Sequence, residues 1–498
     1  MLIRLYLFLF VLAITPLDSR AVFAEDEITL PALGDSGTGL FSPAEEYSLG
    51  QAWLRSLRAS VPLHDDPLTF EYLENLLYGL ASHSALEKRE LDLVLIDDDS
   101  LNAFAVPGGV VGIHTGLLAY AQNSAQLASV LSHELAHLSQ RHFARSVEAA
   151  KRANFASIAG VLAGVVLAAS GSGDAATAAI VSSQAAALDS QLRYSRLHER
   201  EADRIGMQTM VAAGFPASGA TEMFQQMQSA ARLYGEGIPE FLRTHPITEA
   251  RIADAENRAR GAPVQNAVAD LEYQLVRARV LVGQQQNIDD AITRFRHELA
   301  RANGQDDGES RQDDSVHRAA QDSARYGLAL ALNRAGNWRE ARQTLAPLLQ
   351  EIPGRIAYTL LDIEIDQTAG KPADAEKRLR DLYAITPNNY AISIMLAKSL
   401  MQNRSYSTAQ SVLQALATER SKQADVWYLL AEVQGLAGDI LNLHFSRAEF
   451  FTLRGNLNQA RTQLGYALRI AGNDVQVAAR IKQRLRDLQQ IQRDTERL

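Results

Sequence analysis

The stretch Ser132-His133-Glu134-Leu135-Ala136-His137 is the most informative part of this sequence, because it places two histidines at helical spacing. It lies in a run from Asn123 to Ser146 whose apolar residues recur at helical spacing, so we expect one amphipathic helix there. At 3.6 residues per turn, His133 and His137 are about 40° apart around the axis, and both imidazoles can reach one metal ion. Glu134 lies on the same side. Two neutral nitrogen ligands and a nearby carboxylate that is not a ligand are what a zinc hydrolase requires.

The start of this helix carries a cap, but the motif alone does not establish a metal site. Asn123 can cap the first turn, and Gln126 is the matching residue of a capping box. A helix surface can also carry His and Glu as solvated residues. A metal centre therefore needs a third protein ligand elsewhere in the chain.

A second helical run, Tyr194–Asp203, offers that ligand. Glu199 and Asp203 are four residues apart and share one face, whereas Glu201 points roughly 200° away from Glu199. We therefore expect Glu199 to be the third metal ligand. Asp203 would orient a ligand imidazole, that of His133, from behind.

These residues together resemble a known family. His133-Glu134-x-x-His137, followed by Glu199-x-x-x-Asp203, is similar to the gluzincin metallopeptidases of the HtpX and CAAX-prenyl-protease superfamily. Two more stretches carry the resemblance, Asn102–Gly109 before the first helix and Thr244–Ile252 after the second. The resemblance implies one zinc ion (Zn2+) per chain, held by His133, His137 and Glu199. Glu134 would accept a proton from the attacking water and pass it to the leaving amine.

The resemblance also singles out His245, within Thr244-His245-Pro246. A lone loop histidine is usually a surface residue, but the related peptidases carry the same His-Pro element after their third-ligand helix. His245 could occupy the fourth zinc position and keep the enzyme latent, or hydrogen-bond the tetrahedral oxyanion. We favour the blocking role. The expected catalytic residues are thus Glu134, Asp203 and His245.

Composition excludes several classes of protein. The 498 residues carry a net charge of −9. This charge argues against nucleic acid as a principal partner, because phosphate binding requires a basic surface. The chain has no cysteine, so a disulfide scaffold, a cysteine nucleophile and cysteine-ligated zinc are excluded. Any metal must be held by histidine and carboxylate.

The N-terminal residues have the pattern of a secretory signal. Arg4 gives a positive start, Leu5–Ile14 an apolar core, and Val22-Phe23-Ala24 a small-residue cleavage site. An apolar run of this length is short of the ~20 residues that span a bilayer, so we favour cleavage after Ala24 over a retained anchor. The mature protein is then expected in the periplasm.

A small β-sheet is expected before the first metal-binding helix. Leu91–Ile96 reads as one strand, and Phe104–Val106 with Val110–Ile113 reads as a hairpin with Gly108-Gly109 at its turn. In the related peptidases, the strand equivalent to Asn102–Val106 lies at the sheet edge beside the metal. An extended substrate could pair with such an edge, although an ordinary hairpin would read the same way.

Between the two metal-binding helices lies an insertion, residues 140–190, which we interpret as a helical hairpin over the cleft. Its first arm, 153–169, is almost wholly apolar and has Gly160 and Gly164 four residues apart. This arm could make a peripheral membrane contact, or it could be a buried helix of the same domain. The buried helix is slightly favoured because the arm is short of a bilayer span.

The C-terminal part repeats with a period of 34 residues, that of tetratricopeptide helix pairs. The period separates Gly336 from Gly370 and Ala341 from Ala375, and Ala409 follows after one more period. Each such pair buries its apolar face only against its neighbours, so an α-solenoid is expected.

We therefore predict a mainly α-helical chain, in which a zincin-type metallopeptidase domain with a small β-sheet precedes an α-solenoid of tetratricopeptide-like helix pairs. The expected divisions are a signal peptide at 1–24, the peptidase domain at 25–262 and the solenoid at 263–498. By resemblance, the protein is a periplasmic zinc endopeptidase that degrades misfolded or stalled outer-membrane proteins and aids assembly of β-barrel proteins.

The implied partners are unfolded or misfolded envelope proteins and, through the solenoid, the outer-membrane barrel-assembly machinery. The alternative function is that of a chaperone or scaffold with a latent, rarely active protease domain. An integral-membrane protease like the HtpX branch is disfavoured, because the sequence lacks a clear pair of ~20-residue apolar spans.

Overall fold

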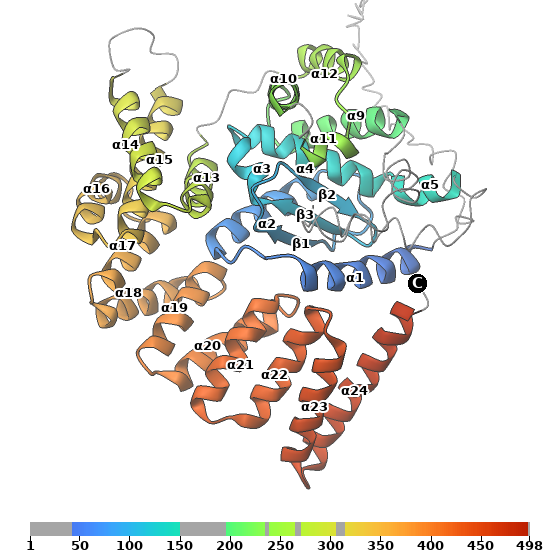
Figure 1. The fold of residues 1–498 in the computed structure, drawn as a ribbon, viewed down its shortest axis with the longest axis vertical. Helices are drawn as coiled ribbons and strands as arrows, with labels where there is room; N and C mark the ends of the chain where they lie inside the picture. The colour runs from blue at the N-terminus through green and yellow to red at the C-terminus, as the bar shows by residue number, and fades with distance from the viewer. Residues whose placement is uncertain (1–41, 150–195, 235–238, 264–269, 305–313, 497–498) are drawn as a thin grey trace, which may run out of the picture. The chain divides into compact units, whose positions relative to one another are not determined.

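The protein is mainly α-helical with one small sheet, as the sequence predicts (Figure 1). The computed structural model describes residues 42–149, 196–234, 239–263, 270–304 and 314–496. The expected signal peptide and most of the expected hairpin insertion, including its 153–169 arm, lie outside these ranges. Within them, none of the helices combines the length and apolar character needed to cross a membrane.

The sheet has three strands, β1 (Asp92–Ile96), β2 (Ala103–Val106) and β3 (Val110–His114), in the order β1-β3-β2. β1 runs parallel to β3, and β2 pairs with β3 in the antiparallel hairpin that the sequence predicts. Gly108 and Gly109 form its turn with φ of +82° and +83°, a region that favours glycine. β2 is therefore an edge strand among the described residues.

Helices cover both faces of this sheet. The first helix, α1 (Pro43–Ser60), packs Trp53, Leu54 and Leu57 against Val94 and Val110 on one face. On the other face lie α2 (Pro67–Ser82) and α4 (Ser124–Ser139), preceded by the short α3 (Thr115–Tyr120). Figure 1 shows the sheet between α1 and α4. The metal-motif helix α4 is thus fixed by the sheet and buried along most of its length.

The expectation of one helix from Asn123 to Ser146 was wrong. Asn123 does cap the start by accepting from Gln126 N, but α4 ends at Ser139 and a separate helix, α5 (His142–Ala149), follows. The chain turns at Arg141, whose φ of +51° is incompatible with a continuing right-handed helix. Arg141 is held in this turn by an ion pair from its Nη2 to Glu46 Oε1 at 3.0 Å.

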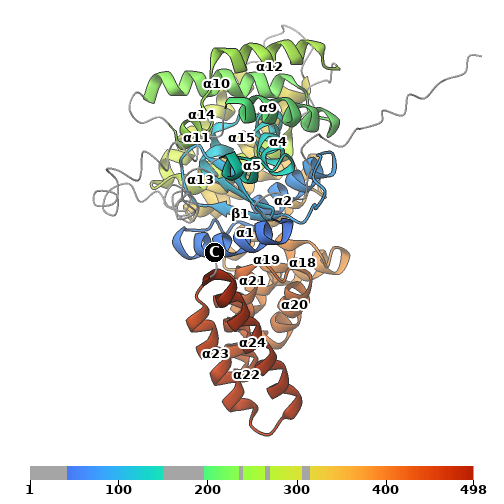
Figure 2. The same cartoon turned by 90° about the vertical axis from the view of Figure 1, so that its right-hand side faces the viewer.

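Four further helices complete the peptidase part. They are α9 (Arg196–Ala212), α10 (Ser218–Tyr234), α11 (Glu240–Thr244) and α12 (Glu249–Gly261). Two of them, α9 and α10, pack directly on α4 on its side away from the sheet, and α12 packs on α9 and α10 (Figure 2). α9 approaches α4 closely at Gly206, where a Cβ would lie 2.9 Å from the His133 backbone nitrogen. A glycine at this crossing lets α9 bring its carboxylates up to the histidines of α4.

The rest of the chain forms successive helix pairs, as the 34-residue period predicts. Ala341, Ala375 and Ala409 are fully buried between helices, and Gly336 and Gly370 end helices with φ of +80° and +75°. The helices are α13 (Leu271–Gln284), α14 (Ile288–Gly304), α15 (Asp314–Arg334), α16 (Trp338–Glu351), α17 (Ile356–Thr368), α18 (Pro372–Ile385), α19 (Tyr390–Gln402), α20 (Tyr406–Glu419), α21 (Ala424–Ala437), α22 (Ile440–Leu453), α23 (Leu457–Ala471) and α24 (Val475–Glu496).

The first repeat helix shares buried contacts with the peptidase part. Tyr273 of α13 is fully buried, and its hydroxyl donates to the carbonyl oxygens of Leu118 (2.8 Å) and Ala121 (3.0 Å). Arg279, also on α13, pairs through its guanidinium with Asp66, the N-cap of α2. Buried hydroxyl and ionic groups therefore connect the two parts of the chain in addition to apolar packing.

Candidate metal centre

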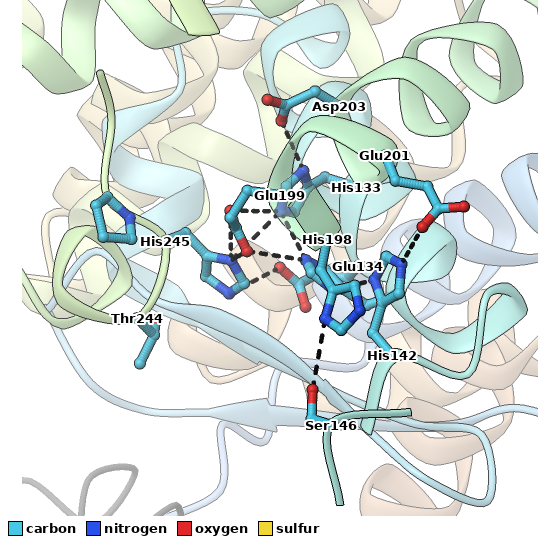
Figure 3. Close-up of polar contacts among 12 residues, drawn as sticks. His133, Glu134, His142, Ser146, His198, Glu199, Glu201, Asp203, Thr244 and His245 are labelled. Atoms are coloured by element: carbon cyan, nitrogen blue, oxygen red, sulfur yellow. Dashed lines mark hydrogen bonds and ion pairs between the residues drawn. The ribbon is translucent and has the colours of Figure 1, made fainter. Parts of the chain in front are cut away.

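The predicted metal ligands come together in one buried cluster (Figure 3). His133 and His137 project from α4, Glu199 from α9, and His245 from the residue that follows α11. All four side chains are buried, and one potential ligand atom from each lies within 4.8 Å of the others. The three ligands expected from the sequence and the predicted fourth-position histidine thus share one site.

The spacing of these atoms fits a tetrahedral metal site. His133 Nε2 lies 3.0 Å from His137 Nε2 and 3.3 Å from His245 Nδ1. Glu199 oxygens lie 3.5 Å from the Nε2 atoms of His133 and His137 and 3.1 Å from His245 Nδ1. Ligands about 2.0–2.1 Å from a tetrahedral zinc are about 3.3–3.4 Å apart, so the side chains are arranged as such a cage would require.

Asp203 contacts the side of the His133 ring that points away from the cluster, as the sequence predicts. Its Oδ1 lies 3.0 Å from His133 Nδ1, which leaves His133 Nε2 directed into the cluster. Arg251 of α12 binds both carboxylate oxygens of Asp203 at 2.7 Å and reaches Glu199 Oε2 at 3.0 Å. It also donates to the Pro246 carbonyl oxygen at 2.8 Å. Arg251 therefore connects the His-Pro loop with both carboxylates.

Sequence reasoning missed the contact on the other ligand histidine. His137 Nδ1 lies 2.8 Å from Nδ1 of His142, the first residue of α5, and His142 Nε2 lies 3.1 Å from Glu201 Oε2. Glu201 points away from Glu199, as expected, but it is connected to the site through His142. The signal in the sequence was a histidine five residues after His137, which becomes relevant only because the helix breaks between them.

Glu134 lies beside the cluster and is almost completely buried. Neither of its carboxylate oxygens makes a hydrogen bond of good geometry among the residues that the structure describes. The Ala105 backbone amide of β2 lies nearby, and His245 Nε2 is 3.6 Å from Oε1. Burial raises the pKa of Glu134. A buried carboxylate left without a hydrogen bond of good geometry is costly in a purely structural role, which is consistent with a group that acts on a bound molecule.

The electrostatics of the cluster favour a bound cation. Burial opposes charge on His133, but hydrogen bonds to Asp203 and Glu199 outweigh it and raise its pKa to about 10. Burial would raise the pKa of Glu199, but His245 and hydrogen bonds from the surrounding imidazoles hold it well below its usual value. By contrast, burial lowers the pKa of His137 well below its usual value and that of His142 to about 4. The charged carboxylates of Glu199 and Asp203 thus favour a positive charge at the cluster, either a proton on His133 or a metal ion that displaces this proton on binding.

A helix that carries His-Glu-x-x-His, with a carboxylate from a later helix placed as a third ligand, is typical of a metallopeptidase. A sequence profile of peptidase family M48 matches residues 67–259, and one of the tetratricopeptide repeat matches 368–433. The chain is 33% identical over 445 residues to the β-barrel assembly-enhancing protease of Escherichia coli (strain K12), over 89% of this chain and 88% of the relative.

Other relatives agree with this classification. A putative β-barrel assembly-enhancing protease of Vibrio cholerae is 32% identical over 440 residues, 88% of each chain. The mitochondrial metalloendopeptidase OMA1 of Bos taurus is 33% identical over 165 residues, 30% of this chain and 29% of the relative. The chain therefore belongs to the β-barrel assembly-enhancing proteases of peptidase family M48. It is a metalloendopeptidase, and the relatives support this function over that of a scaffold.

Proposed function

We propose that this chain is a periplasmic zinc endopeptidase that degrades misfolded or stalled outer-membrane proteins and aids the assembly of β-barrel proteins in the outer membrane. The observation that carries the zinc assignment is the set of 3.0–3.5 Å distances among ligand atoms of His133, His137, Glu199 and His245. The link to β-barrel proteins is supported by the names of the relatives, which describe proteases that enhance β-barrel assembly.

In the proposed reaction each side chain of the site has one task. Zinc, when bound, lowers the pKa of a water molecule and polarises the scissile carbonyl. His133, His137 and Glu199 hold the ion, and Asp203 fixes the orientation of the His133 ring. Glu134 takes the proton of the attacking water and later gives it to the leaving amine. Its raised pKa suits a group that must both accept and release a proton.

The proposed substrate path is the edge strand β2. It pairs only with β3 among the described residues, so its outer edge can accept an extended peptide by backbone hydrogen bonds. β2 also packs against α4, the helix that carries the metal motif. A peptide bound along β2 would therefore be held close to Glu134 and the ligand histidines.

The test of the enzymatic assignment is Glu134→Gln. The amide has the same shape as the carboxylate but cannot take the water proton, so we expect unchanged zinc content and no cleavage of an unfolded polypeptide. Normal turnover by the purified variant would overturn the assignment of Glu134 as the base.

His245 is proposed to keep the resting enzyme latent. Its Nδ1 completes the tetrahedral spacing with His133 and Glu199, and its Nε2 faces Glu134, so the imidazole occupies the position that a reacting water would need. We expect His245→Ala to raise basal proteolysis. A fall in kcat would instead assign His245 to oxyanion stabilisation, and unchanged activity on several substrates would remove both roles.

The solenoid is proposed to bind the substrate protein or the barrel-assembly machinery. Nucleic acid is not proposed as a partner. Exposed apolar side chains on α21 and α23, including Tyr428 and Ile470, offer contact area. The periplasmic location rests on the sequence pattern of residues 4–24, and a peripheral membrane contact by 153–169 on its apolar composition. Site-specific photo-crosslinking from Tyr428 and Ile470 in the envelope would identify the partner, and absence of protein crosslinks would contradict this surface.

A further inference from the structure

The two ligand histidines of α4 are held from behind in different ways. Each presents Nε2 to the cluster, where the two Nε2 atoms are 3.0 Å apart. The Nδ1 of His133 faces the carboxylate of Asp203 at 3.0 Å. The Nδ1 of His137 faces a different kind of group. It lies 2.8 Å from a second imidazole nitrogen, Nδ1 of His142.

Proton placement follows from the chemistry of this chain of contacts. If Nε2 of His137 binds a metal, its Nδ1 must carry the proton and donate it. Nδ1 of His142 must then accept, so the proton of a neutral His142 sits on Nε2. That atom lies 3.1 Å from Glu201 Oε2, an acceptor. His137 thus donates to His142, and His142 donates to the Glu201 carboxylate.

The surroundings hold this arrangement in place. His142 is fully buried, and the His198 ring stacks on it with 4.4 Å between centroids and 14° between planes. Arg145 Nη1 binds the same Glu201 oxygen at 2.9 Å. Figure 3 shows Glu201 and His142 on the opposite side of the cluster from His245. The turn at Arg141 separates α5 from α4 and places His142 against His137 of α4.

We propose that His142 and Glu201 form a second orienting arm, which fixes the His137 ring and its tautomer for metal binding as Asp203 does for His133. This inference rests on the proposed zinc site. His142 and Glu201 are positioning residues: they act through His137 and do not touch the metal or the substrate. Outer partners of metal-ligating histidines commonly change metal affinity about 10–100-fold.

The test is the zinc dissociation constant, measured by competition with a chelator of known affinity, for full-length His142→Ala, His142→Asn and Glu201→Ala. We expect His142→Ala to weaken zinc binding about 10–100-fold. In His142→Asn, the amide oxygen can accept from His137 Nδ1, so most of the affinity should return. Glu201→Ala should retain zinc with a smaller loss, because its effect passes through His142.

The matched control is His114→Ala. His114 is an equally buried histidine of the same domain, with Nδ1 2.8 Å from Ser100 Oγ and 3.5 Å from Asp98 Oδ1, and it lies outside the cluster. Its loss should lower stability without changing zinc affinity. An equal zinc affinity of His142→Ala and His114→Ala would overturn the proposed arm.

A second measurement decides the outcome if His142→Ala does not fold. In wild-type protein labelled with 15N-histidine and loaded with zinc, the proposal requires one ring protonated at Nδ1 whose neighbour, His142, is protonated at Nε2. His142 protonated at Nδ1 would overturn it. If wild-type protein binds no zinc at all, the proposed metal site itself fails, which is a different result from unchanged affinity in the variants.

Discussion

Two buried clusters of ionisable side chains in this protein differ in whether their groups are paired. Around Asp66, Arg279 donates to both carboxylate oxygens at 2.6–3.0 Å and to the Tyr326 hydroxyl at 2.9 Å. In the metal cluster, imidazole nitrogens face one another and Glu134 makes no hydrogen bond of good geometry among the described residues. The charges of the Asp66 cluster are balanced by protein groups alone, whereas the proposed metal site would take its balancing charge from a bound cation.

Pairing of the charged groups therefore distinguishes a structural ionic cluster from a functional one. Burial would raise the pKa of Asp66, but Arg279 holds it well below its usual range, so both charges persist and cancel. Such a pair connects α2 to α13 and needs nothing else. Perturbed pKa values alone would mark both clusters, and the count of unmatched acceptors separates them.

The largest expected effect follows removal of the metal. We expect chelation to reduce cleavage of an unfolded polypeptide to background and to lower stability, because His133, His137 and Glu199 would lose their shared partner. At metal concentrations 1,000 times Kd the stabilisation is about 4 kcal/mol. The measurement is thermal unfolding and cleavage with and without chelator. The chelator shift should be the same in an Asp66→Asn variant, and a shift that depends on Asp66 would contradict the separation of the clusters.

The second effect concerns the paired cluster. Asp66→Asn leaves the buried Arg279 guanidinium with only the more distant Glu364 carboxylate, 3.6 Å from its Nη2. We therefore expect a loss of up to about 3–5 kcal/mol in the free energy of unfolding. The double variant Asp66→Asn/Arg279→Met should recover part of this loss. Denaturant unfolding measures both, and zinc content serves as the control because it should not change. Loss of zinc in Asp66→Asn would show that the two clusters are not independent.

A smaller effect is expected at Glu240, an intermediate case. It is 14% exposed, and its nearest cation is Arg243 Nη2 at 3.8 Å. Burial raises the pKa of Glu240 to about 7 from its usual 4.5. The folded state therefore binds this proton more tightly than the unfolded state, and stability is lost as pH rises from about 4.5 through 7.

The matching variant is Glu240→Gln, which cannot titrate. Relative to wild type, it should gain stability from pH 4.5 to pH 8, by roughly 1–2 kcal/mol, and show little difference at pH 4.5. Denaturant unfolding at the two pH values measures this gain. A stability difference that is the same at both pH values would contradict the raised pKa.

Much of the fold and of the site could be predicted because the determinants are local. The spacing of His133 and His137, the shared face of Glu199 and Asp203, and the glycine turn of the hairpin each depend on a few neighbouring residues. The 34-residue period likewise identified the buried alanines of the solenoid, because each helix pair repeats the same packing.

What sequence reasoning missed depends on contacts between distant segments or on an unusual backbone angle. The left-handed backbone conformation of Arg141 separates α4 from α5, and the pattern of apolar residues does not predict it. Glu201 was placed correctly on its own helix, but its partner His142 comes from 59 residues earlier in the chain. Arg251 lies in the stretch Thr244–Ile252 that carries the family resemblance. Its contacts with Asp203 and Glu199 form only because α12 packs beside α9.

The most direct test of the central claim is the zinc content of purified protein, measured by elemental analysis after dialysis. We expect one zinc per chain in wild type and in Glu134→Gln, and none in Glu199→Ala, because the latter change removes a ligand from the proposed site. Wild-type protein that retains no zinc after loading, or Glu199→Ala protein that retains a full equivalent, would contradict it.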